Sequence, residues 1–150
     1  MEATENGIRI KVLSTETDRI PLDVAQGMQR MVEATQHNDK LTLNICLSYG
    51  SRGEIVNACK AIATDISEGM MDPSDITESV VGKKMLTGEC PDPDIIIRTS
   101  GEYRLSNFLL WQVAYSEMFF LNKTWPELTK GDLVKIIRNY ARDRQRRFGK

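Results

Sequence analysis

Pro91-Asp-Pro-Asp-Ile-Ile-Ile-Arg-Thr-Ser-Gly-Glu-Tyr-Arg-Leu-Ser-Asn-Phe-Leu-Leu-Trp111 is the stretch of sequence that decides the fold. Its two prolines end any preceding helix, and residues 95–97 are three isoleucines in a row. An unbroken β-branched run of this kind is typical of a strand that is covered on both faces, as in a parallel sheet. Polar residues dominate positions 98–106, and the apolar spacing beyond them predicts a helix over residues 107–115 with Ser106 as its N-cap.

The polar residues that follow this strand predict an anion-binding site. Ligands of open parallel sheets bind beyond the carboxyl ends of the strands, and Arg98 and Arg104 lie there with hydroxyl groups and a glycine. Planar guanidinium groups match the oxygens of a phosphate or diphosphate. The alternative is that one arginine forms a structural ion pair with Glu102 or Asp94. The serines have no neighbouring base to activate them, which argues against covalent hydrolase chemistry.

The rest of the chain alternates between strand and helix patterns. The first strand begins almost at residue 1, and no element is expected before it. The predicted strands are 8–12, 41–49, 95–97 and 117–121, and the predicted helices are 21–35, 55–69, 72–88, 107–115 and one that Asp132 caps. Strands that are separated by helices predict an α/β fold in which a parallel sheet is flanked by helices.

The segment Ser48-Tyr-Gly-Ser-Arg-Gly-Glu54 lies between the second strand and the next helix. Its glycines, serines and arginine indicate a second strand end that faces a ligand crevice. The glycines are also explained by a tight turn alone. The segment matches neither a Gly-x-Gly-x-x-Gly loop nor a Walker loop, so it indicates no nucleotide site.

Length and composition are typical of one soluble globular domain, residues 1–150. The formal net charge is −1, but residues 131–150 hold seven Lys or Arg against two Asp or Glu. A basic segment can contact phosphates, nucleic acid or an acidic surface, or it can be the solvated face of a terminal helix. It is accompanied by no nucleic-acid motif and no interleaved aromatic residues, so we expect no nucleic-acid partner.

The three cysteines, Cys46, Cys59 and Cys90, form no Cys-x-x-Cys pair. Their spacing predicts neither a disulfide framework nor a zinc site, and it favours a reducing compartment. No stretch approaches the ~20 apolar residues of a membrane-spanning helix. We therefore expect a cytoplasmic protein, with peripheral association on a membrane surface left open.

Three ordered blocks of the sequence resemble the cis-prenyltransferases, that is, the undecaprenyl and dehydrodolichyl diphosphate synthases. The first block is Asp94 to Glu117 followed by Trp125-Pro126. The second is Leu41-Thr-Leu-Asn-Ile with Tyr49-Gly-Ser-Arg-Gly-Glu-Ile55, and the third is Arg146-Arg-Phe-Gly149. Together they span essentially the whole chain.

This resemblance implies a transferase that condenses isopentenyl diphosphate, with cis geometry and with Mg²⁺, onto an allylic diphosphate such as farnesyl diphosphate. The product would serve undecaprenol or dolichol biosynthesis. The residues that would grip isopentenyl diphosphate are Arg98, Arg104, Leu105 and Ser106. Glu117 would be the magnesium ligand, and no residue is assigned as an acid or a base. Arg147 and Gly149 would belong to a tail that reaches the partner's site in a homodimer or heterodimer.

The chain also departs from the family pattern. Residues 1–150 contain no Asp-Gly-Asn-Gly-Arg-Trp block, which in the family holds the allylic diphosphate and Mg²⁺. We therefore expect the C-terminal part of a cis-prenyltransferase domain, inactive by itself. Tyr103 stands where some bacterial members have a histidine near the metal. The alternative function is a non-catalytic partner subunit of a heteromeric enzyme, although the chain keeps the residues expected to bind substrate.

Overall fold

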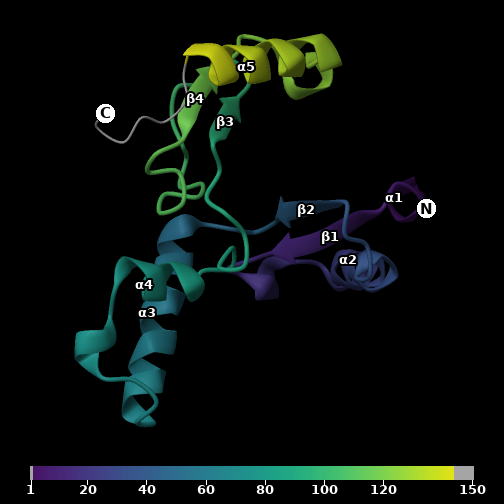
Figure 1. Cartoon of the computed structure of the whole chain (residues 1–150). Coiled ribbons are helices and arrows are strands. Elements are labelled where there is room, and N and C mark those ends of the chain that lie inside the picture. Colours follow the sequence, from purple (N-terminus) through teal and green to yellow (C-terminus); the bar gives the residue numbers. More distant parts are fainter. Residues whose placement is uncertain (1, 144–150) are drawn as a thin grey trace. The chain divides into compact units, whose positions relative to one another are not determined.

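The computed structural model describes residues 2–143, which form two compact units that meet in the chain between Glu89 and Cys90. Figure 1 shows the elements of both units. The predicted α/β class is confirmed, because each unit pairs two strands in parallel and carries helices beside them. The prediction that residues 1–150 form a single domain stays a prediction.

The first unit is built around the parallel pair of β1 and β2, in register from Ile8 beside Leu41 to Leu13 beside Cys46. Its elements in chain order are α1 (Glu2–Glu5), β1 (Ile8–Leu13), η1 (Thr17–Arg19), α2 (Leu22–Thr35), β2 (Leu41–Cys46), α3 (Ser51–Ser67), η2 (Pro73–Asp75) and α4 (Glu78–Lys83). The expectation that no element precedes the first strand is wrong, because α1 does.

The core of the first unit is formed by apolar side chains of its strands and helices, namely Ile10, Leu13, Ala58, Ile62 and Met85. Thr35, at the end of α2, is fully buried beside them. Its hydroxyl accepts a hydrogen bond from the Ile10 amide at 3.1 Å and donates to the Met31 carbonyl at 2.8 Å. The end of α2 is thereby fixed against β1.

The helix boundaries follow the predicted capping residues, with two differences. As predicted, α2 follows Pro21, and Gly69 follows α3 with a left-handed φ of +71°. However, α3 begins at Ser51, so the end of the predicted loop forms its first turn. The predicted helix 72–88 is instead the short η2 and α4, because Asp72 caps one and Thr77 caps the other.

The second unit contains the shorter parallel pair of β3 (Ile95–Arg98) and β4 (Glu117–Phe120), followed by η3 (Trp125–Glu127) and α5 (Lys130–Asp143). The register places Ile95 beside Glu117 and Arg98 beside Phe120. Ile96 is buried in the middle of β3, but Ile95 and Ile97 are half-buried, so the predicted coverage of both faces is found on one face only. Among residues 2–143, no helix is long and apolar enough to cross a membrane.

The predicted helix over residues 107–115 is wrong, because the chain forms successive turns there. Ser106, Asn107 and Leu109 have φ values of 50°, 63° and 48°. These left-handed conformations cannot belong to a right-handed helix. The turns are closed by single hydrogen bonds, such as the one from the Val113 amide to the Leu109 carbonyl at 3.0 Å.

The start of α5 also differs from the prediction that Asp132 caps it. Thr129 lies before the helix, and its hydroxyl oxygen accepts from the Asp132 amide at 3.2 Å. The Asp132 carboxylate accepts in return from the Thr129 amide at 2.9 Å. The two residues form a reciprocal capping box, in which Asp132 is the second partner.

Candidate functional site

The candidate site is built on the loop that follows the carboxyl end of β3. This loop is bound to the segment after β4 by three backbone hydrogen bonds. The Leu121 amide donates to the Arg98 carbonyl at 2.8 Å, Gly101 donates to Leu121 at 2.9 Å, and Ser100 donates to Lys123 at 2.7 Å. Ser100 and Gly101 both have left-handed φ values, 66° and 67°. The neighbouring segment therefore holds the loop in a conformation that it would seldom adopt alone.

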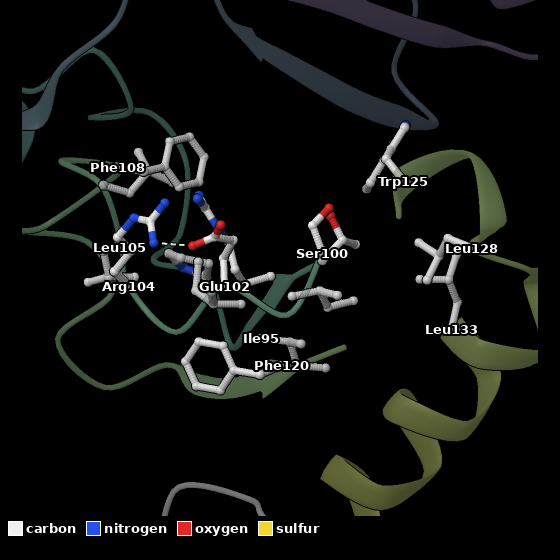
Figure 2. A pocket seen from close by; sticks show the side chains of 16 residues that line it. Ile95, Ser100, Glu102, Arg104, Leu105, Phe108, Phe120, Trp125, Leu128 and Leu133 are labelled. Atoms are coloured by element: carbon white, nitrogen blue, oxygen red, sulfur yellow. Dashed lines mark ion pairs between the residues drawn. The ribbon is translucent and has the colours of Figure 1, made fainter. Parts of the chain in front are cut away.

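An open pocket of about 1020 Å³ lies against this loop (Figure 2). One wall is polar and comes from the loop itself; it consists of Arg98, Thr99, Ser100, Glu102 and Arg104. The rest of the lining is mostly apolar and includes Phe108, Phe120, Trp125, Leu128 and Leu133. The pocket thus offers positive charge and hydroxyl groups beside hydrocarbon and aromatic surface.

The two arginines have different partners. Arg104 forms an ion pair with Glu102, drawn as a dashed line in Figure 2. Arg98 donates from Nη2 to the Ser106 hydroxyl at 3.5 Å, the long limit of a hydrogen bond. The arginine–Glu102 pair considered from the sequence is therefore present. Asp94 instead accepts from the Tyr140 hydroxyl at 3.0 Å.

Most of the predicted substrate-binding residues lie together. Arg98, Arg104 and Leu105 line the pocket, and Ser106 contacts Arg98. The pocket lining contains two arginines and one carboxylate, Glu102, which pairs with Arg104. Among the pocket-lining residues, positive charge therefore exceeds negative charge by one. A net positive charge in a pocket favours the approach of an anion.

Glu117 lies apart from these residues. It begins β4 beside Ile95, whereas Arg98 ends β3, so about 10 Å of strand separates the two positions. Within the described part of the chain, no group of three or more His, Cys, Asp or Glu side chains is placed to hold a metal ion. The role of Glu117 as a magnesium ligand stays a prediction. Arg147 and Gly149, the predicted tail residues, lie outside the described residues.

The apolar side chains of the pocket, among them Trp125 and Leu133, were not predicted from the sequence as part of the site. Trp125 projects from η3 with 71% of its surface exposed. The capping box between Thr124 and Glu127 fixes this turn, because Glu127 accepts from the Thr124 amide at 2.7 Å. Leu133, in the first turns of α5, lies near it in Figure 2. The recognisable signal was the Trp-Pro pair, whose proline is typical of a first helical turn.

The loop after β2 uses its polar groups differently. Glu54, only 1% exposed, accepts from the Tyr49 hydroxyl at 2.5 Å and from the Leu86 amide at 2.8 Å. Burial, and next the hydrogen bond to Glu54, raise the pKa of Tyr49 well above its ordinary value. Burial and the nearby Glu54 also raise the pKa of Cys46. The carboxylate and the phenol of this loop are therefore engaged in holding the first unit together.

Comparison with known proteins adds a family match along the whole chain. The family model described as "Putative undecaprenyl diphosphate synthase" matches residues 1–149. An isoprenyl transferase of Streptococcus agalactiae serotype V is 47% identical over 152 residues, which cover 99% of this chain and 60% of that protein. One from Chlorobaculum tepidum is 42% identical over 146 residues, covering 97% of this chain and 54% of that protein.

Two solved structures share the fold. Lavandulyl diphosphate synthase from Lavandula x intermedia, solved in complex with dimethylallyl diphosphate, has a TM-score of 0.88 and 32% identity, covering 95% of this chain and 61% of its own. A probable undecaprenyl diphosphate synthase from Campylobacter jejuni has a TM-score of 0.82 and 33% identity, and the match covers 99% of this chain and 68% of that one. The chain spans about three fifths of the length of the curated relatives that it matches.

Proposed function

The chain belongs to the undecaprenyl diphosphate synthase family, and from that premise we propose that its second unit binds isopentenyl diphosphate for a cis-prenyltransferase reaction. The acceptor would be an allylic diphosphate such as farnesyl diphosphate. The lavandulyl diphosphate synthase that resembles this chain was solved with dimethylallyl diphosphate, so a diphosphate ester is bound by a protein of this fold.

One observation carries the proposal: a single pocket joins two arginines to an apolar wall. Isopentenyl diphosphate has the same two parts, a highly charged diphosphate and a five-carbon branched hydrocarbon. Arg98 and Arg104 would each donate paired N–H groups to diphosphate oxygens. The hydrocarbon would lie against side chains such as Phe108 and Trp125, where its burial is favourable.

The remaining polar residues would orient the diphosphate. The Ser106 hydroxyl, which contacts Arg98, would add a donor to the phosphate oxygens. Leu105, which lies between Arg104 and Ser106 in the sequence and lines the pocket, would contribute its backbone. Glu102 would have to share Arg104 with the substrate, because it already forms an ion pair with that arginine. The substrate then replaces a contact to a carboxylate with contacts to diphosphate oxygens, which carry more negative charge.

In the proposed reaction, the terminal alkene carbon of isopentenyl diphosphate forms a bond to the first carbon of the allylic diphosphate. The bond from that carbon to oxygen breaks, diphosphate leaves with the electron pair, and a proton leaves the isopentenyl carbon next to the one that carries the diphosphate. The contribution of this unit would be to hold the attacking alkene in a fixed position, since orientation alone lowers such barriers substantially. No side chain is assigned to take the proton.

The described residues do not form a magnesium site by themselves, because Glu117, the one predicted ligand, begins β4 beside Ile95 and lies apart from Arg98. Mg²⁺ is commonly held by one or two carboxylates together with substrate phosphates and water. Glu117 would supply such a carboxylate, and the remaining ligands would be phosphate oxygens. When bound, the ion would neutralise negative charge on diphosphate oxygens. We also propose, from the resemblance of Arg146-Arg-Phe-Gly149 to the family's closing motif, that Arg147 and Gly149 reach the site of a partner subunit, in a homodimer or a heterodimer.

The proposed ligand is tested by calorimetric titration of the chain with isopentenyl diphosphate, with isopentenyl alcohol and with inorganic pyrophosphate. We expect the diphosphate ester to bind more tightly than either part alone, because the pocket contacts both. Binding of the alcohol as tight as that of the ester would contradict an arginine grip. The control variant is Arg19→Ala, which removes an exposed arginine that pairs with Glu16 in the first unit. It should bind isopentenyl diphosphate as tightly as the unchanged chain.

A further inference from the structure

The conformation of the site loop depends on the segment after β4. Lys123 accepts a hydrogen bond from the Ser100 amide through its backbone carbonyl, at 2.7 Å. Two residues earlier, Leu121 accepts from the Gly101 amide at 2.9 Å. Because Ser100 and Gly101 are both left-handed, the loop needs these bonds to keep its shape. A contact that restrains the backbone of Lys123 therefore also restrains the loop that carries Arg98 and Arg104.

The side chain of Lys123 is anchored at the start of α5. Its ammonium group lies 2.8 Å from both carboxylate oxygens of Asp132. Asp132 also accepts from the amide and the hydroxyl of Thr129, at 2.9 and 2.6 Å. The side chain thus connects the helix cap to the segment that holds the loop. Lys123 does not line the pocket and reaches the site only through its backbone.

We propose that Lys123 is a positioning residue for anion binding in this pocket, a role that rests on the proposed function. Its ion pair with Asp132 restrains residues 121–123, and these restrain Ser100 and Gly101. The backbone of Arg98, from which its guanidinium projects, belongs to the same ladder, because the Arg98 carbonyl accepts from the Leu121 amide. Removing the lysine charge would leave the fold intact, since Thr129 still pairs with Asp132 and caps α5.

The inference is tested first without any ligand. Lys123→Met keeps most of the apolar stem and removes the charge. In this variant we expect hydrogen exchange of the Ser100 and Gly101 amides to become about tenfold faster, with the amides in the middle of α5 unchanged. Lys123→Arg should restore protection, because a guanidinium also pairs with a carboxylate. Unchanged exchange at both loop amides would overturn the inference, whatever the pocket binds.

Binding supplies the second measurement. Lys123→Met should weaken isopentenyl diphosphate binding about three- to tenfold, and the same substitution should have little effect when Asp132 is already Asn. An equal loss in both backgrounds would contradict positioning through Asp132. The matched control is Lys11→Met, which breaks an ion pair with Glu89 in the first unit and should leave binding unchanged. Absence of binding in the unmodified chain would reject the proposed function, and the amide exchange would still decide the role of Lys123.

Discussion

Two loops of this molecule look alike in sequence and differ in structure. Residues 48–54 follow β2 and residues 98–106 follow β3, and both contain arginine, glycine, serine, tyrosine and glutamate. In the first loop the glutamate, Glu54, is 1% exposed and binds the Tyr49 hydroxyl and a backbone amide. In the second loop Glu102 lines an open pocket and pairs with Arg104.

The difference comes from what each loop packs against. The first loop turns into α3 at Ser51, so Glu54 lies in the first helical turn and is covered by the segment at Leu86. The second loop does not enter a helix, because Ser106, Asn107 and Leu109 are left-handed. Its charged side chains remain at the surface of a pocket. The same residue types therefore stabilise the fold in one loop and are available to a ligand in the other.

The largest effect on stability is expected from breaking the buried network with Glu54→Ala. The Tyr49 hydroxyl and the Leu86 amide would lose their acceptor in a buried environment. We expect the free energy of unfolding of the first unit to fall by about 2–4 kcal/mol. Urea unfolding followed by circular dichroism measures this change.

The control for this comparison is Glu33→Ala, an exposed carboxylate on α2 that accepts from the Gln29 side chain. It should change the stability by less than about 0.5 kcal/mol. Equal effects of the two substitutions would mean that the buried network does not hold the first loop.

A second variant, Glu117→Gln, tests whether the site of the open loop includes the glutamate that begins β4. If Glu117 is the magnesium ligand, the gain in affinity for isopentenyl diphosphate on adding Mg²⁺ should be about tenfold smaller in the variant than in the unchanged chain. Titrations with and without Mg²⁺ measure this, and Glu89→Gln, an exposed carboxylate of the first unit, serves as the control. A variant that responds to Mg²⁺ like the unchanged chain would show that Glu117 has a structural role.

The smallest effect concerns the cap that supports the open loop. Lys123 and Thr129 hold the pKa of Asp132 far below its usual value of 3.8. A carboxyl group whose pKa is lower in the folded state stabilises the fold above its unfolded pKa, and this contribution disappears as the pH falls. Asp132→Asn should therefore lower Tm at pH 7, and the difference should shrink below pH ~4. A difference that is constant from pH 7 to pH 2.5 would contradict this origin.

Much of the fold could be predicted from the sequence because its signals are local. Alternation at residues 8–12 and the isoleucine run at 95–97 both led to strands, and Pro21 and Gly69 correctly bounded helices. The helix over residues 107–115 was wrong for a reason that is not local. Its apolar spacing is compatible with a helix, but Asn107 and Leu109, together with the predicted N-cap Ser106, are left-handed and exclude one.

In the candidate site, too, the features that depend on neighbouring residues were predicted, and those that depend on distant residues were not. Arg98 and Arg104 were predicted together because residues close in sequence beyond one strand end must lie close in space. The distance of Glu117 from them depends on the register of β3 and β4, which the sequence does not specify. The burial of Glu54 was also missed, because its partner Leu86 lies 32 residues away.

The most direct test of the contrast between the two loops measures the dissociation constant of isopentenyl diphosphate for two variants. Arg98→Ala combined with Arg104→Ala removes both pocket arginines, and Arg52→Ala removes the arginine of the first loop. We predict that the double variant loses roughly a hundredfold or more in affinity, since each charged hydrogen-bonding group contributes about 1.5–3 kcal/mol. Arg52→Ala should bind like the unchanged chain. A double variant that binds normally, or an equal loss in Arg52→Ala, would contradict the account.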